Sequence, residues 1–250
     1  MVFSYWLMVI ESIHYFCEKN EKLSIMKYII FDIDGTLADT KDIDDKCFVA
    51  AFYQSFGINI VNENWAALQN VTDWGITEEI IEREWGRSPS EQEYEKMRSE
   101  LVTLLLEANK NQPRHFTEVA GAKAFFEHLS GLQNYRLGIA TGAWGDSAKI
   151  KLGAIGIDWS SVCFSNSDHF KTRDGITNSV IRQLDTFGEQ PKQIIYFGDG
   201  EWDYTTCKKM GIEFIGIDVR ANGKLEKLGA KYVFRDFTAP EKIMQLIKDL

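Results

Sequence analysis

Short apolar runs recur along the chain, and most of them end in glycine, asparagine or aspartate. The first, KYIIFDID at 27–34, is rich in β-branched and aromatic residues, as expected of a strand that is buried on both faces of a sheet. Similar runs predict five further strands, at 135–142, 160–166, 192–200, 212–218 and 231–234.

Segments with helical spacing lie between these runs, at 121–130, 145–155, 174–187, 201–210 and 240–249. Strands that alternate with helices are typical of a parallel sheet with helices on both faces. The pattern therefore predicts an α/β protein with a three-layer, Rossmann-like core.

Residues 41–113 break this alternation, because helical patterns follow one another at 42–56, 63–70, 76–85 and 89–110. Ser88 and Pro89 predict the start of the last of these helices. The chain should therefore consist of a core, formed by 26–40 and 114–250, and an all-helical insert at 41–113. Three tryptophans of the insert, Trp65, Trp74 and Trp85, are interpreted as its small core, and a stacking platform for a substrate is the alternative.

The first 25 residues begin with the apolar stretch MVFSYWLMVI, which ends at Glu11. That stretch is too short for a membrane helix, which needs about 20 apolar residues. It also lacks the positive start and small-residue cleavage site of a signal peptide. An extra helix, a disordered extension and translation from a start codon upstream of the natural one remain as interpretations. Met26, immediately before the first strand, favours the third.

Charge and cysteine usage narrow the class of protein. The net charge is −9 and no Lys/Arg run is present, which argues against binding to nucleic acid or to an anionic membrane surface. A small anionic substrate remains possible, because a local site can be positive on an acidic protein. The four cysteines are scattered without a CxxC pair, which predicts reduced thiols in a cytoplasmic protein.

Polar residues with catalytic potential follow the strands. Ligands of open parallel sheets bind beyond the carboxyl ends of the strands, so these positions should meet at one edge. The residues concerned are Asp32 and Asp34 after the first strand, Thr141 and Gly142 after the second, Lys171 and Arg173 beyond the third, and Asp199 and Asp203 after the fourth.

Electrostatics predicts a cation at this edge. Two carboxylates about 4 Å apart repel by about 4 kcal/mol at an effective dielectric constant near 20. Asp32, Asp34 and Asp199 therefore need a positive partner, and hard oxygen ligands without nearby cysteine or histidine suit Mg²⁺. With a hydroxyl from Thr141 and a cation from Lys171, the set is typical of a site that handles phosphate.

Four of these segments, in this order along residues 26–250, resemble the motifs of the haloacid dehalogenase superfamily of aspartate-nucleophile phosphotransferases. The segments are DIDGT, the threonine of GIATGA, Lys171 of HFKTRDG, and GDGEWD. The insert resembles the C1-type cap of that superfamily. One departure concerns the third motif, where many relatives have proline after the lysine and this chain has Thr172. Lys171 is the preferred catalytic cation, and Arg173 is the competing candidate.

The resemblance implies a role for each motif residue. Asp32 would be the nucleophile and a metal ligand, and Asp34 would be the general acid and base and would offer its backbone carbonyl to the metal. Thr141, the Gly142 N–H and Lys171 would hold the phosphoryl group. Asp199 would complete the metal site, and Asp203 would act one step further out.

Three functions follow from these expectations. The first is a Mg²⁺-dependent phosphatase that hydrolyses a small phosphorylated metabolite. In that case Thr72, Asp73 and Arg83 of the insert are candidates for contacts with the leaving group, and the alternative is that they are capping or exposed polar residues. The second is a phosphomutase, which would need a cationic site in the insert for a second phosphate. The third is a non-catalytic protein of the same fold. Residues 41–113 contain no histidine and no cluster of basic residues, which argues against the phosphomutase, and no motif carboxylate is lost, which argues against the non-catalytic protein, so the phosphatase ranks first.

Overall fold

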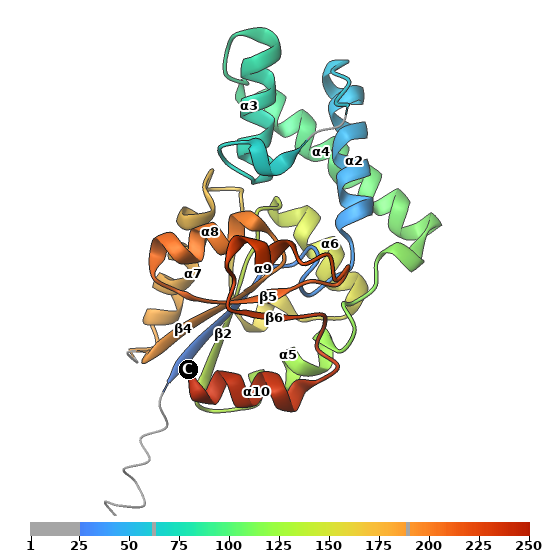
Figure 1. The fold of residues 1–250 in the computed structure, drawn as a ribbon. Coiled ribbons are helices and arrows are strands. Elements are labelled where there is room, and N and C mark those ends of the chain that lie inside the picture. Colours follow the sequence, from blue (N-terminus) through green and yellow to red (C-terminus); the bar gives the residue numbers. More distant parts are fainter. Residues whose placement is uncertain (1–25, 62–63, 189–190) are drawn as a thin grey trace, which may run out of the picture.

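The computed structural model describes residues 26–61, 64–188 and 191–250, so the interpretations of residues 1–25 lie outside the described residues. Its centre is a six-stranded, fully parallel sheet in the order β3-β2-β1-β4-β5-β6 (Figure 1). The strands are β1 (Lys27–Phe31), β2 (Tyr135–Ala140), β3 (Cys163–Ser165), β4 (Gln193–Gly198), β5 (Glu213–Ile217) and β6 (Tyr232–Phe234). All six predicted strands and the α/β fold are confirmed.

Alternate residues of the central strand face opposite sides of the sheet. Ile29 and Phe31 of β1 belong to one hydrophobic core, and Tyr28 and Ile30 belong to the other. The first core is covered by α5 (Ala122–Ser130), α6 (Gly145–Ile155) and α10 (Pro240–Asp249). The second core is covered by α7 (Arg173–Asp185), α8 (Glu201–Met210) and the short α9 (Lys224–Leu228), which the sequence pattern did not predict. Strands buried on both faces explain why the apolar runs are continuous rather than alternating.

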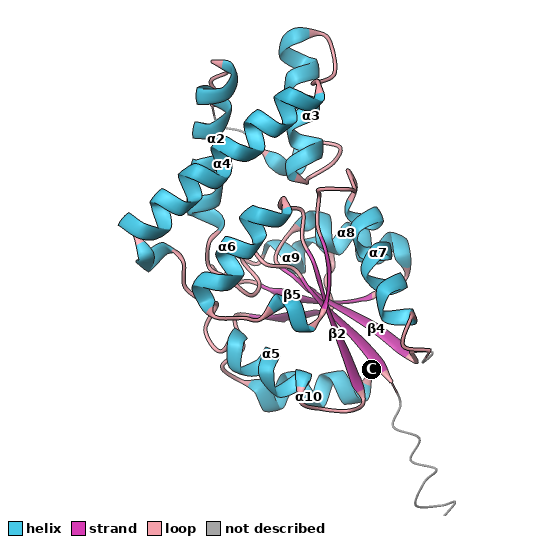
Figure 2. Cartoon of the chain, turned by 180° about the vertical axis from the view of Figure 1, so that it is seen from behind, coloured by secondary structure: helices cyan, strands magenta, loops and turns pink. Residues whose placement is uncertain are grey.

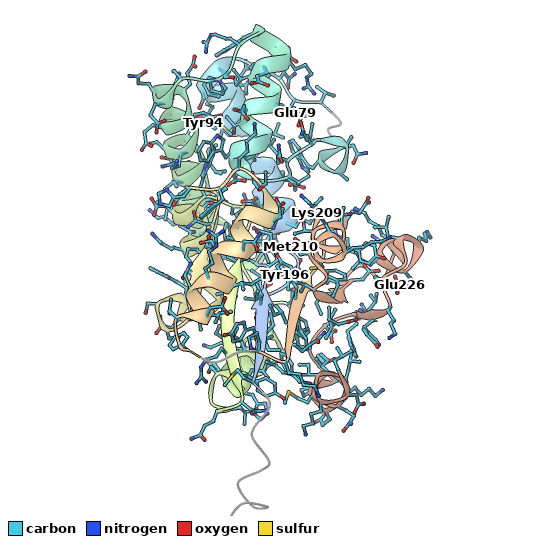
Figure 3. All side chains as sticks on the ribbon, turned by 90° about the vertical axis from the view of Figure 1, so that its left-hand side faces the viewer. Glu79, Tyr94, Tyr196, Lys209, Met210 and Glu226 are labelled. Carbon is cyan, nitrogen blue, oxygen red and sulfur yellow. The ribbon has the colours of Figure 1, made fainter. Side chains whose placement is uncertain are left out.

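The insert is helical and lies over one end of the sheet (Figure 2). It contains α2 (Lys41–Phe56), α3 (Asp73–Trp85) and α4 (Glu91–Asn111), which share a hydrophobic cluster with Trp144 of the core. In the side view of Figure 3, Tyr94 and Glu79 of the insert lie above Tyr196, which belongs to the sheet. The insert therefore has its own apolar contacts and also touches the core.

Two predictions for the insert were wrong in detail. The helix expected at 63–70 is only a short 3-10 helix at Trp65–Ala67 in the described part of that segment. The helix expected from Ser88 and Pro89 begins later, because Ser90 forms a capping box with Glu93 and satisfies the first backbone N–H groups of α4.

The tryptophans of the insert are only partly buried. Trp85 is 39% exposed, and Trp65 and Trp74 are half-buried. The buried positions are mostly aliphatic, such as Ile80, Met97 and Leu101, so the expectation of a tryptophan core was wrong. In the part of the chain that the structure describes, no helix is long and apolar enough to cross a membrane.

Candidate active site

The chain leaves β1 directly into the first two candidate carboxylates. The backbone N–H of Asp32 still donates to the carbonyl of Phe197 on β4 (2.9 Å), which fixes Asp32 at the carboxyl end of the sheet. After Asp34 the chain turns back, and the Gly35 N–H donates to the carbonyl of Ala38 (2.7 Å). The spacing of two residues therefore brings both carboxylates to one cavity, which they line together.

Gly35 is required by the shape of this turn. Its φ is +82°, in the left-handed region, and a Cβ at this position would lie 2.5 Å from Cγ of Asp199. The glycine of the DxDGT segment thus allows the first and fourth motifs to approach each other.

Thr141 and Gly142 follow β2 and line the same cavity as Asp32 and Asp34. The backbone N–H of Thr141 donates to Ser165 on the neighbouring strand (3.2 Å). A Cβ on Gly142 would lie 2.7 Å from the guanidinium of Arg173, so the absence of a side chain lets that cation come close to the strand end.

Arg173, and not Lys171, lies beside the first aspartate. Nη1 of Arg173 is 3.1 Å from Oδ1 of Asp32 and 3.4 Å from Oδ1 of Asp203, and Nε donates to the carbonyl of Val71 (2.8 Å). The ammonium of Lys171 pairs with Glu78 of the insert instead, and the Lys171 side chain is 41% exposed.

The start of α7 explains this placement. Thr172 caps the helix by accepting a hydrogen bond from the Gly175 N–H, so Arg173 is the first helical residue and Lys171 lies outside the helix. Thr172 is a preferred N-cap residue, so a helix start at Arg173 could have been predicted from the sequence.

The residues after β4 complete an acidic cluster. Carboxylate oxygens of Asp32, Asp199 and Asp203 lie within 4.8 Å of one another. Oδ1 of Asp199 is buried without a hydrogen-bond partner, whereas Asp203 accepts hydrogen bonds from the Gly200 N–H (3.1 Å) and the Tyr196 hydroxyl (3.3 Å). A hard cation fits this donor set, because it would satisfy the orphaned oxygen and offset the repulsion of the carboxylates.

Burial and mutual repulsion raise the pKa of Asp32. Loss of hydration is the main cause, the charge of Asp203 adds to it, and the charge of Arg173 opposes it. Burial also raises the pKa of Asp203, again against the effect of Arg173. A bound cation would favour the ionised form of both carboxylates.

Two lysines at this site were missed by the sequence analysis. Nζ of Lys41 is 2.6 Å from Oδ2 of Asp199. Nζ of Lys151 on α6 is 2.6 Å from Oδ2 of Asp34 and 2.6 Å from Oδ1 of Asp44. For Lys151 a signal existed, because its position shares the apolar face of α6 with Ala148 and Ile155.

The insert supplies the outer part of the cavity. Asp45, Phe48 and Trp65 line it, and the indole N–H of Trp65 donates to Asp45 (3.1 Å). Trp202, which follows β4, lines the cavity from the core.

The three candidate leaving-group contacts have different positions. Thr72 and Asp73 line the cavity, although Thr72 also caps α3 and Asp73 accepts from the Trp144 N–H (2.8 Å). Arg83 instead pairs with Glu84 at the surface. The interpretation of Thr72 as a capping residue is thus confirmed, and Thr72 also lines the cavity.

Comparison with known families identifies this arrangement. The family model for haloacid dehalogenase-like hydrolases matches residues 29–217, which is more than half of the chain. The chain belongs to this family. The match begins within β1 and ends with β5, so it includes all the strand ends that carry the candidate site.

Relatives within the family have the same extent. A curated protein of Clostridium perfringens (strain 13 / Type A), named as the pyrophosphatase PpaX, is 24% identical over 239 residues, which are 90% of this chain and 99% of that protein.

Solved structures show the same fold. A hydrolase from Pseudomonas syringae matches with a TM-score of 0.68 at 20% identity, over 89% of this chain and 98% of that one. CbbY from Rhodobacter sphaeroides, in complex with phosphate, matches with a TM-score of 0.63 at 17% identity, over 86% of this chain and 96% of that one.

Proposed function

We propose that this protein is a Mg²⁺-dependent phosphatase that hydrolyses a small phosphorylated metabolite through an aspartyl-phosphate. The observation that carries the proposal is the position of Asp32. It is buried at the end of a central strand, beside Arg173, and shares one cavity with Asp34 and Thr141. Family membership, the curated relative named as a pyrophosphatase and the phosphate-bound CbbY add support.

In the first step, a carboxylate oxygen of Asp32 attacks phosphorus and the bond from phosphorus to the leaving oxygen breaks. Asp34 gives its proton to that oxygen, so an alcohol departs and an aspartyl-phosphate remains. In the second step, Asp34 takes a proton from water as the water oxygen attacks phosphorus. The bond from phosphorus to Asp32 then breaks, which releases phosphate and returns both aspartates to their starting states.

Positive charge and hydrogen-bond donors are needed where the phosphoryl group is transferred. We assign the cationic role to Arg173, because its guanidinium contacts Asp32 and is held by Asp203 and the Val71 carbonyl. The Thr141 hydroxyl and the Gly142 N–H are the proposed donors to the phosphoryl oxygens.

Asp32, Asp199 and the backbone carbonyl of Asp34 are the proposed ligands of Mg²⁺. The bound ion would neutralise the charge of the phosphoryl oxygens and of the clustered carboxylates. Asp203 would orient Arg173, whose guanidinium lies between Asp203 and Asp32.

We propose that residues 41–113 form the cap that closes over the substrate and excludes water during transfer. Thr72 and Asp73 of this segment line the cavity, and Thr72 donates to the Lys171 carbonyl of the core (2.7 Å). The pairing of Lys171 with Glu78 would be a second tie between cap and core.

The cavity favours hydrolysis over mutase chemistry. Among the described residues, the cations that line it are Lys41 and Arg173, and both already pair with motif aspartates. A mutase would need a further cation to hold a second phosphate. We also propose a reduced, cytoplasmic setting, in which Cys47, Cys163 and Cys207 would remain thiols.

A screen for phosphate release from a panel of metabolite phosphates tests this function. With Mg²⁺ present, we expect a few compounds to release phosphate, and we expect no release in EDTA or with the Asp32→Asn variant. Asp32→Asn keeps the size of the side chain, so its folding should be unchanged by circular dichroism. Release by that variant at the wild-type rate would exclude Asp32 as the nucleophile.

A further inference from the structure

Lys151 is the most completely buried lysine near the site. It lies on α6 of the core, and its side chain is 0% exposed. A buried ammonium is costly unless carboxylates and hydrogen bonds compensate it. Two carboxylates do so here, since Nζ lies 2.6 Å from Oδ2 of Asp34 and 2.6 Å from Oδ1 of Asp44.

The partners of Lys151 come from different parts of the fold. Asp34 follows β1 in the core, whereas Asp44 lies in the first turn of α2, the first helix of the insert. Lys151 thus joins the end of β1 and the start of the insert to α6, and it lies 117 residues beyond Asp34 in the sequence. An ordinary core position of α6 would be filled by an apolar side chain, as at Leu152, so burial alone does not explain a lysine here.

Asp34 is held at both carboxylate oxygens. The hydroxyl of Thr40 donates to Oδ1 (2.6 Å), and Nζ of Lys151 donates to Oδ2 (2.6 Å). The side chain nevertheless remains 19% exposed and lines the cavity next to Asp32. Two contacts from behind therefore restrict its rotation, while one edge of the carboxyl group still faces the space for substrate.

We propose that Lys151 is a positioning residue that, together with Asp44, orients Asp34 toward the leaving-group oxygen. This inference rests on the proposed phosphatase function, in which Asp34 is the general acid and base. General acids depend strongly on position, because the proton must pass between atoms within hydrogen-bond reach. Since Asp44 belongs to the insert, the orientation of Asp34 also depends on how α2 sits against the core.

The test uses the leaving group of the substrate. Departure of an alkoxide needs a proton from Asp34, whereas departure of nitrophenolate needs little help. The value of kcat/KM reports the steps up to departure of the alcohol, even where hydrolysis of the aspartyl-phosphate limits kcat. We therefore compare two substrates of each variant. One is p-nitrophenyl phosphate, and the other is the alkyl phosphate for which the wild-type protein has the highest kcat/KM.

The main variant is Lys151→Met, which keeps the length of the side chain without its charge. We expect kcat/KM for the alkyl phosphate to fall about 100-fold and kcat/KM for the nitrophenyl phosphate to fall less than about 10-fold, since general acid catalysis typically contributes 10²–10⁴-fold. Lys149→Met is the matched control. Lys149 lies on the same helix, 41% exposed beside Asp146, and its loss should change neither value.

A second variant guards against loss of folding. Lys151→Met with Asp44→Asn removes one cation and one carboxylate, so the net charge of this cluster is unchanged. It should fold and show the same dependence on the leaving group as the single variant. Equal losses for both substrates, or no loss for either, would overturn the proposal. Failure of both variants to fold would show that Lys151 serves the fold, and would overturn it as well.

The wild-type protein and Asp32→Asn separate this inference from the proposed function. If the wild-type protein releases no phosphate from either ester, or if Asp32→Asn remains active, the proposed function itself fails. If both behave as expected and the Lys151 variants do not depend on the leaving group, only the positioning role of Lys151 is wrong.

Discussion

Substituting Arg173 and Lys171 one at a time decides which of the two residues is the catalytic cation. Arg173 contacts Asp32 and Asp203 and is 13% exposed, whereas Lys171 pairs with Glu78 and is 41% exposed. Arg173→Lys keeps the charge but shortens the side chain and loses the planar guanidinium that contacts Asp32, Asp203 and the Val71 carbonyl. Lys171→Met removes only the pair with the insert.

The distances give the size of the expected effect. A unit charge 3.1 Å from Asp32 interacts by about 5 kcal/mol at an effective dielectric constant near 20, and the shorter lysine would lose part of this interaction because its charge would lie further from Asp32. Only the part that grows in the transition state contributes to catalysis, and loss of one such preorganised donor typically costs 10²–10³ in rate. We therefore expect kcat/KM to fall about 100- to 1,000-fold in Arg173→Lys.

The Lys171 variant should behave differently. Lys171 is 41% exposed, and an ion pair with so exposed a cation contributes about 0–1 kcal/mol, so its loss should change kcat/KM by at most about fivefold. The assay is hydrolysis of p-nitrophenyl phosphate with saturating Mg²⁺, with thermal unfolding as the control for folding. A 100-fold loss in Lys171→Met, with near wild-type activity in Arg173→Lys, would refute the assignment of Arg173.

Three further predictions concern the turn, the insert and the pH dependence of stability. Gly35→Ala should abolish phosphatase activity, because the residue has a φ of +82° and the new Cβ would lie 2.5 Å from Cγ of Asp199. A fully active variant would show that the turn can adapt to a side chain. Leu101→Ala should lower the free energy of unfolding, measured by urea titration, by about 2–5 kcal/mol, because Leu101 is fully buried in the insert. A decrease of less than about 1 kcal/mol would contradict this packing. Burial raises the pKa of Asp73 to about 6, so the folded state holds a proton that the unfolded state releases near pH 4. The free energy of unfolding should therefore decrease between about pH 4 and pH 6, by about 3 kcal/mol from this residue, and Asp73→Asn should remove that part of the slope; an unchanged slope would contradict the shift.

The fold followed from the sequence because its strands are buried on both faces. KYIIFDID and KQIIYFGDG are continuous apolar runs that end in aspartate, so both the strand and the position of its polar end were visible. The prediction of a helix at 63–70 was wrong because the few apolar residues there, such as Trp65 and Leu68, pack against the hydrophobic cluster of the insert from a short 3-10 helix and the residue after it. Short patterns of this kind do not determine whether a helix continues.

The sequence did not predict which side chains of distant segments meet at the site. Arg173 is two residues from the expected lysine, and only the start of α7 decides which side chain turns toward Asp32. Lys149 and Lys151 are two residues apart on the same helix, but Lys151 is buried against Asp34 and Lys149 is at the surface. Helical periodicity separates these two lysines, whereas the identity of the partners depends on how distant segments meet.

In the proposed reaction, Asp32 carries the phosphoryl group during turnover. The most direct measurement is mass spectrometry of peptides from acid-quenched protein during turnover of p-nitrophenyl phosphate with Mg²⁺. We expect a phosphoryl group on the peptide that contains Asp32, and its absence from the Asp32→Asn variant. Rapid hydrolysis by the wild-type protein with no phosphoryl group on Asp32, or with the group on another residue, would exclude Asp32 as the residue that carries it.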